Sequence, residues 1–129
     1  MKKINKFEDI ESWKSARKLT NEIYKATSIG EFVRDFGLKD QIRRASVSIL
    51  SNIAEGFERG NDKEFANFLA IAKASTGEVR AQLYVALDQG YLPASTFEQL
   101  SKLAIEIGEL LSGFMRYLSQ STLRGNRYR

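Results

Sequence analysis

Basic side chains near the two ends of the chain have the types and spacing best suited to a chemical task, which is the binding of phosphate groups. Residues 1–6 and 122–129 contain six lysines and arginines and no acid. In the second range a tyrosine is interleaved with arginines, and this combination pairs phosphate contacts with a base-stacking surface, as single-stranded nucleic acids favour. The candidate nucleic-acid-binding residues at the ends are Lys2, Lys3, Lys6, Arg124, Arg127, Tyr128 and Arg129.

The net charge of +4 comes entirely from these two basic tails. Without their six cations, 14 basic and 16 acidic side chains remain, so the rest of the chain has a net charge of −2. The start, MKKINKFEDIESW, lacks the apolar segment of a secretory signal, and no run approaches the ~18 apolar residues of a membrane span. We therefore expect a cytoplasmic protein with no membrane partner.

Most catalytic chemistry is excluded by composition, because the chain has no histidine and no cysteine. The serines within residues 46–51 have no base to activate them. A di-metal site from Glu22, Glu55, Glu78 and Glu106 is conceivable in a helical bundle, but such sites use Glu-x-x-His pairs. The sequence thus predicts a non-enzymatic protein with no metal and no cofactor.

Apolar residues at helical spacing, separated by glycines and a proline, predict four helices. Gly60 is suited to end the second helix, and Asn61 with Glu64 forms a capping pattern for the third. Ser95 with Glu98 forms the same pattern for the fourth. The helices are expected at about 9–27, 38–59, 62–89 and 95–121, within a single domain of residues 1–129.

Four long helices with short connections predict an all-α, antiparallel up-down-up-down bundle. This topology places both termini and the Gly60 turn at one end, where Arg59 and Lys63 join the tail cations as candidate nucleic-acid-binding residues. In the connector over 28–37, Phe32 and Phe36 are expected to fold over the opposite end of the bundle.

The stretch over 41–60 is apolar around an arc of roughly 180°, wider than the ~100° stripe of an ordinary surface helix. One stripe faces the bundle interior, and the second needs a partner of its own. We therefore expect a homo-oligomer formed through the second and third helices. The candidate interface residues are Arg43, Val47, Leu50, Ala54, Phe57, Ile71 and Ala74.

Four polar residues of the second helix have separate interpretations. Asn52 and Glu55 lie together and are expected to fix helix packing or the Gly60 turn by hydrogen bonds. Arg43 projects amid the second stripe, where its guanidinium is expected to pair with a carboxylate across a subunit contact. Arg44 lies on the polar face, either as a solvated charge or as a further nucleic-acid contact.

The segment QIRRASVSILSNIAEGFERG, followed by KEFANFLAIAKAS, EVRAQL and GYL, resembles the four-helix bundle proteins encoded within intervening sequences of bacterial 23S rRNA genes, often labelled S23 ribosomal protein. The resemblance covers most of the chain, from FEDIESWKSARKL through the fourth helix. One departure is Ala74, where the family often has glycine. The net charge of −2 outside the tails does not fit a constitutive ribosomal component.

The resemblance implies a non-enzymatic helical protein that assembles as a ring, with a pentamer favoured. A more distant relative is the accessory protein of diversity-generating retroelements, which binds nucleic acid and a reverse transcriptase. Two functions therefore stay open: a ring that binds RNA, or DNA, through electrostatics, and a protein-interaction scaffold for an enzyme partner such as a reverse transcriptase.

Overall fold

The computed structural model describes residues 4–122, which contain four α-helices, two short 3-10 helices and no strand. The prediction of an all-α protein with four helices is confirmed. In chain order the elements are η1 (Phe7–Asp9), α1 (Glu11–Ala26), η2 (Gly30–Arg34), α2 (Phe36–Glu58), α3 (Asp62–Asp88) and α4 (Ala94–Thr122).

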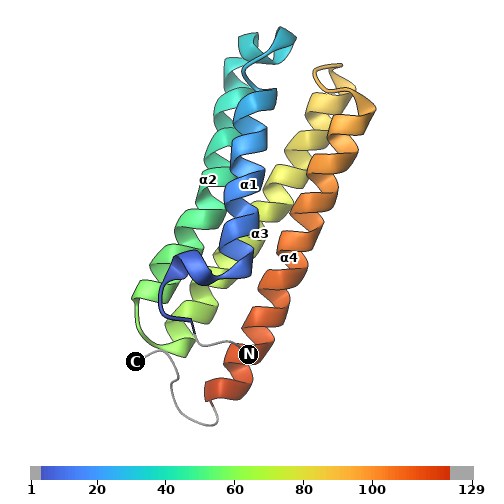
Figure 1. Cartoon of the computed structure of the whole chain (residues 1–129). Helices are drawn as coiled ribbons and strands as arrows, with labels where there is room; N and C mark the ends of the chain where they lie inside the picture. Colours follow the sequence, from blue (N-terminus) through green and yellow to red (C-terminus); the bar gives the residue numbers. More distant parts are fainter. Residues whose placement is uncertain (1–3, 123–129) are drawn as a thin grey trace.

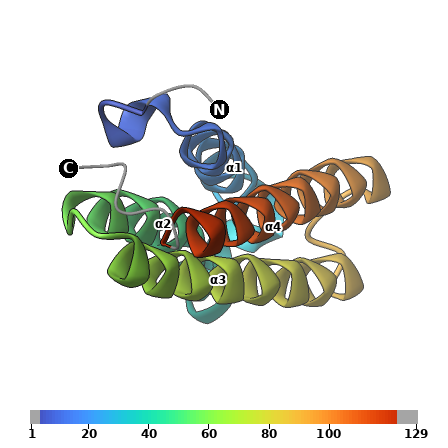
Figure 2. The same cartoon turned by 90° about the horizontal axis from the view of Figure 1, so that it is seen from below.

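Each α-helix packs against two others. α3 lies against α2 and α4, and α1 contacts α2 and α4 on the other side. Figure 1 shows η1 and the α2–α3 turn at one end of the molecule and η2 with the α3–α4 connection at the other. The view from below in Figure 2 shows α1 on one side of α4 and α3 on its other side. The core lies between the helices, and every helix contributes fully buried side chains such as Leu19, Ile49, Leu69 and Leu111.

The first two helices begin at residues other than the predicted ones. α1 begins two residues later than expected, because Phe7–Asp9 form η1 and Ile10 is extended. α2 begins two residues earlier, because Asp35 acts as its N-cap: one carboxylate oxygen accepts a hydrogen bond from the Leu38 N–H at 3.1 Å. The sequence pattern missed this cap because an exposed Phe36 follows it.

Of the two later helix starts, that of α3 agrees with the prediction and that of α4 does not. The N-cap of α3 is Asn61, whose side-chain oxygen accepts from the Glu64 N–H at 2.9 Å. α4 begins at Ala94, so Ser95 lies inside the first turn and is not the cap. The Phe97 N–H there donates to the carbonyl of the preceding proline at 3.0 Å. The four helix ends lie within one residue of the predicted positions.

Only one of the two connector phenylalanines covers the end of the bundle. Phe32 is 1% exposed and stacks on Tyr91 with 5.2 Å between ring centroids, whereas Phe36 is 71% exposed. The expectation for Phe36 was wrong, because this residue opens α2 and points away from the core. The Tyr91 hydroxyl donates to the Asp35 carboxylate at 3.0 Å, and this hydrogen bond raises the pKa of Tyr91.

The wide apolar arc of α2 is explained largely within one chain. α2 lies between α1 and α3, so it has two apolar flanks. Leu50 and Phe57, expected on a face that needs a second subunit, pack against the core of their own chain. Val47, at 36% exposed, stays outside this packing. The premise that the whole second stripe needs an external partner is therefore corrected.

Gly56 allows α2 and α3 to approach each other closely. A Cβ atom at this position would lie 2.6 Å from Cβ of Phe68 and 2.9 Å from a ring carbon of Phe65. Real Cβ atoms do not come this close to carbon, so any side chain would force the two helices apart. The backbone of α2 at Gly56 therefore packs directly against the first turns of α3.

We expect Gly56→Ala to lower the free energy of unfolding by about 1–3 kcal/mol, the usual cost of overpacking, although alanine favours a helix. Gly77→Ala is the matched control, because a Cβ there meets no heavy atom within 4 Å. The control should raise stability by about 0.5–1 kcal/mol. Urea unfolding followed by far-UV circular dichroism measures both. Equal stabilisation by the two variants would contradict the close contact.

Candidate nucleic-acid interface

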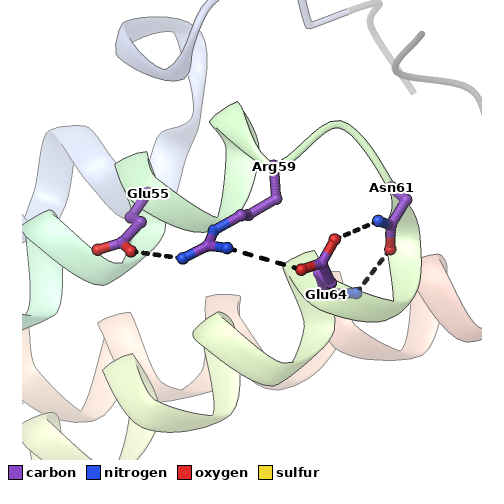
Figure 3. A network of polar contacts seen from close by, with 4 residues as sticks. All are labelled: Glu55, Arg59, Asn61 and Glu64. Carbon is purple, nitrogen blue, oxygen red and sulfur yellow. Dashed lines mark hydrogen bonds and ion pairs between the residues drawn. The ribbon is translucent and has the colours of Figure 1, made fainter.

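Arg59, a predicted nucleic-acid contact, is held in a polar network at the α2–α3 turn (Figure 3). One terminal nitrogen donates to Glu55 at 3.0 Å, and the other lies 3.8 Å from a carboxylate oxygen of Glu64. The guanidinium carbon also lies 4.9 Å from the centroid of the Phe68 ring. Two carboxylates thus outweigh the single positive charge, and Arg59 joins the end of α2 to the start of α3.

Glu64 connects this network to the N-terminus of α3. Its backbone N–H is capped by Asn61, and its carboxylate contacts the Asn61 side-chain amide. The same carboxylate also faces Arg59. The turn is therefore fixed by charge and capping together, and Glu55 takes part through Arg59.

The remaining predicted cations differ in what surrounds them. Lys6 and Lys63 are exposed and form no ion pair within residues 4–120, whereas Arg44 pairs with Asp40 at 2.9 Å on the open surface. The other predicted tail residues lie outside the described part of the chain: Lys2, Lys3, Arg124, Arg127, Tyr128 and Arg129.

The described part of the predicted basic end contains more carboxylates than cations. η1 and the α2–α3 turn meet at this end of the molecule (Figure 1). Lys6, Arg59 and Lys63 are outnumbered there by Glu8, Asp9, Glu55, Glu58 and Glu64. A positive potential at this end would therefore have to come from the two tails.

A separate cationic groove lies between α3 and α4. It has a volume of about 520 Å³, and its cations are Lys73 and Arg80 from α3 and Arg116 from α4. None of these three belongs to the ion pairs formed within residues 4–120. Glu109 is the one carboxylate in the lining, so the groove has a net positive charge of two.

Glycines keep this groove open at its centre. Gly77 on α3 and Gly108 on α4 line it, and a Cβ at Gly77 would meet no heavy atom within 4 Å. Sequence reasoning missed this groove. Lys73 and Arg80 are seven residues apart and so share one face of a helix, which the sequence alone could have indicated. The placement of α4 beside that face could not be predicted from the sequence, because it depends on how the two helices pack.

Arg43 was predicted to reach a carboxylate of another subunit. Within the described residues it contacts the end of α1 in its own chain. Its Nε donates to the Thr27 hydroxyl at 2.8 Å, and a terminal nitrogen donates to the Ser28 hydroxyl at 3.1 Å. The guanidinium carbon lies 4.3 Å from the centroid of the Tyr24 ring. Arg43 therefore joins α1 to α2 within one chain, and its pairing with a carboxylate of another subunit stays a prediction.

Asn52 lies in a chain of hydrogen bonds between α2 and α3. Its amide donates to the Ser48 carbonyl at 2.8 Å and contacts the Ser48 hydroxyl at 3.0 Å. The hydroxyls of Ser48 and Ser75 are 3.0 Å apart across the two helices. Asn52 thus supports a polar contact within the helix pair that Gly56 also joins.

Exposed apolar side chains are found on the outer surface of α2 and α3. Val47, Ile71 and Val85 are 36%, 50% and 45% exposed, and Ala74 is exposed beside them on α3. Ala54 is half-buried on α2. Of the seven predicted interface residues, Val47, Ile71 and Ala74 therefore remain most available to a partner.

Two features of the described part of the chain concern other classes of site. Within that part of the chain, no group of three or more acidic residues is placed to hold a metal ion. None of its helices combines the length and apolar character that crossing a bilayer requires.

Comparisons with known proteins identify a family and a fold. A family model described as 23S rRNA-intervening sequence protein matches residues 8–113. A solved structure, a protein with unknown function from the S23 ribosomal protein family of Bacteroides thetaiotaomicron, is similar with a TM-score of 0.75 and 22% identity. The match covers 81% of this chain and 95% of that chain. No curated protein matches this chain.

We expect Arg59→Gln to act on stability, because its charge is already engaged by two carboxylates. The loss of a surface ion pair and a cation–π contact should lower the free energy of unfolding by about 0.5–1 kcal/mol. Lys63→Gln removes the same charge but breaks no ion pair within residues 4–120, and it should change this free energy by less than about 0.5 kcal/mol. Urea unfolding of both variants tests this, and a larger effect of Lys63→Gln would refute the assignment.

Proposed function

The chain belongs to the 23S rRNA-intervening sequence protein family, and we propose that it is a non-enzymatic accessory protein that binds RNA through the phosphate backbone. The single observation that carries the proposal is the groove in which Lys73, Arg80 and Arg116 gather without ion-pair partners among the described residues. A cation that is already paired with a carboxylate gains less free energy from binding phosphate than an unpaired cation does. Free cations on one surface release counterions when RNA binds there, which favours association.

The groove suits a nucleic-acid backbone better than it suits base recognition. Glycines at 77 and 108 let a ligand approach the helix backbones, and the lining contains no aromatic side chain on which a base could stack. Lys and Arg contacts to phosphate position a nucleic acid without reading its sequence. Binding is therefore electrostatic, with the basic tails as additional cations.

Self-association of an up-down-up-down bundle is the second part of the proposal. At about 100° per residue, Ile71 and Lys73 lie roughly 160° apart around α3, so the apolar surface and the groove face different directions. Copies joined through Val47, Ile71 and Val85 would leave the groove accessible. A ring, with a pentamer favoured by the family resemblance, would present several grooves to one RNA and raise its avidity.

The absence of histidine and cysteine supports a non-enzymatic role, and a cytoplasmic location is part of the same proposal. The exposed Ile71 and Val85 also support a second candidate, a scaffold that binds an enzyme partner such as a reverse transcriptase through apolar contacts. Salt separates the two candidates, because phosphate binding weakens steeply with ionic strength and apolar binding does not.

The triple variant Lys73→Gln, Arg80→Gln, Arg116→Gln should weaken binding of a labelled single-stranded RNA and reduce the slope of log affinity against log salt by about two, at ~0.7 per phosphate contact. The charge-matched control is Lys14→Gln, Lys25→Gln, Arg44→Gln, which removes three cations already paired on the surface. Fluorescence anisotropy over a salt series measures both.

A chain lacking residues 123–129 measures the contribution of the C-terminal tail in the same assay. Equal losses in the two triple variants would mean that RNA responds only to net charge and would refute the groove. Binding by the parent chain that is insensitive to salt would instead favour the scaffold.

The double variant Ile71→Glu, Val85→Glu should reduce the mass of the protein in solution while leaving its helicity unchanged, because charges would enter an apolar contact between copies. Ile29→Glu is the control, since Ile29 is 69% exposed in the α1–α2 connection. Light scattering after size-exclusion chromatography gives the masses. A parent chain that is monomeric, or a double variant with the parent's mass, would exclude this interface.

A further inference from the structure

A second cleft lies between the start of α1 and the C-terminal half of α4, and Glu109 is the one lining residue that it shares with the cationic groove. It encloses about 450 Å³, which is within the range of small-molecule sites. Its walls are mainly apolar, from Ile4 and Ile10 on one side and Leu110 and Phe114 on the other. Gly113 lines it too, and the absence of a side chain there leaves room beside α4.

The charges around this cleft all have one sign. Asp9, Glu11 and Glu109 line it, and no lysine or arginine does. Among the described residues, Glu11 forms a surface pair with Lys14 at 3.5 Å, while Asp9 and Glu109 form no ion pair. The helix dipole places roughly half a positive charge at the N-terminus of α1, and this offsets only part of the negative charge of the carboxylates. The cleft therefore combines an apolar interior with a negative rim.

A buried hydroxyl provides an independent sign of a missing ligand. Ser12 lines the cleft, is 2% exposed, and its oxygen has no hydrogen-bond partner within the described part of the chain. Ser12 is the second residue of α1, so no carbonyl one turn earlier in the helix is available to it. Buried polar groups are almost always paired, which makes an unpaired one next to an open cleft a place for a ligand group.

We propose that this cleft binds a small amphipathic cation, an amine or guanidinium attached to an apolar body. The apolar body packs between Ile10, Leu110 and Phe114. The charged group donates hydrogen bonds to the rim carboxylates and to the oxygen of Ser12. This site shares Glu109 with the cationic groove but no other lining residue, and its ligand is a cation whereas RNA is an anion.

Calorimetric titration of the full chain, without RNA, tests the site with three probes of one shape: 4-phenylbutylamine, 4-phenylbutanol and 4-phenylbutyrate. The amine should bind at one site per chain, and the alcohol and the carboxylate about tenfold more weakly or worse, because only the amine makes charge-assisted hydrogen bonds. Equal binding of all three probes, or no saturable binding of the amine, overturns the proposal.

Substitutions in the cleft then test where the amine binds. Glu109→Gln should weaken its binding about tenfold, while Glu98→Gln, an exposed carboxylate elsewhere on α4, should leave it unchanged. Gly113→Leu should fill the cleft and abolish binding, whereas Gly77→Leu, which fills the cationic groove, should not. Circular dichroism verifies that each variant is folded.

Two results would remove the small-molecule assignment. Undiminished binding in folded Gly113→Leu would place the amine elsewhere. Binding that appears only in a chain lacking residues 123–129 would mean that the basic tail of the protein occupies the cleft instead. Neither result depends on RNA, so failure here is distinguishable from failure of the proposed function.

Discussion

The contact of α2 with α3 at Gly56 is the constraint on which the rest of the structure depends. With no side chain at this position, the α2 backbone meets Phe65 and Phe68, and the tight turn that follows can return directly into α3. The Arg59 network joins the two helices at the turn, and the Ser48–Ser75 hydroxyl contact joins them further along. α3 is thereby fixed on one side, and α4 packs on its other side to form the cationic groove.

Charge in this protein is divided between cations used for folding and cations left free. Arg43 holds the end of α1 through two hydroxyls and an aromatic ring, and Arg59 holds the α2–α3 turn through two carboxylates. Lys73, Arg80 and Arg116 form no such contacts within the described residues. A count of basic residues cannot separate these classes, because the difference depends on which helix faces each side chain. The distribution of charge over a surface is informative only when its pairing is known.

Periodicity and chain breakers allowed the helices to be predicted from the sequence, because the apolar spacing and the cap at Asn61 are local properties. What failed depended on neighbours distant in sequence. The wide arc of α2 correctly indicated two apolar partners, but not that α1 of the same chain supplies one of them. The cap at Asp35, its contact with Tyr91 and the groove between α3 and α4 each require knowledge of tertiary placement. Apart from Lys6, the tail residues that dominated the sequence-based site lie outside the described part of the chain.

The order of contacts also has a kinetic consequence. Three of the four main contacts between α-helices join consecutive helices, whereas the α1–α4 contact joins two helices whose residues are separated by roughly 70 to 110 positions in the sequence. Closing so long a loop costs more chain entropy than the local pairings do, so the α1–α4 contact is expected to form last during folding and to open first under native conditions. Amide hydrogens along that seam should then exchange through openings that leave the α2–α3 pair intact. The apolar cleft lies on this seam, which gives a bulky ligand a route of entry without global unfolding.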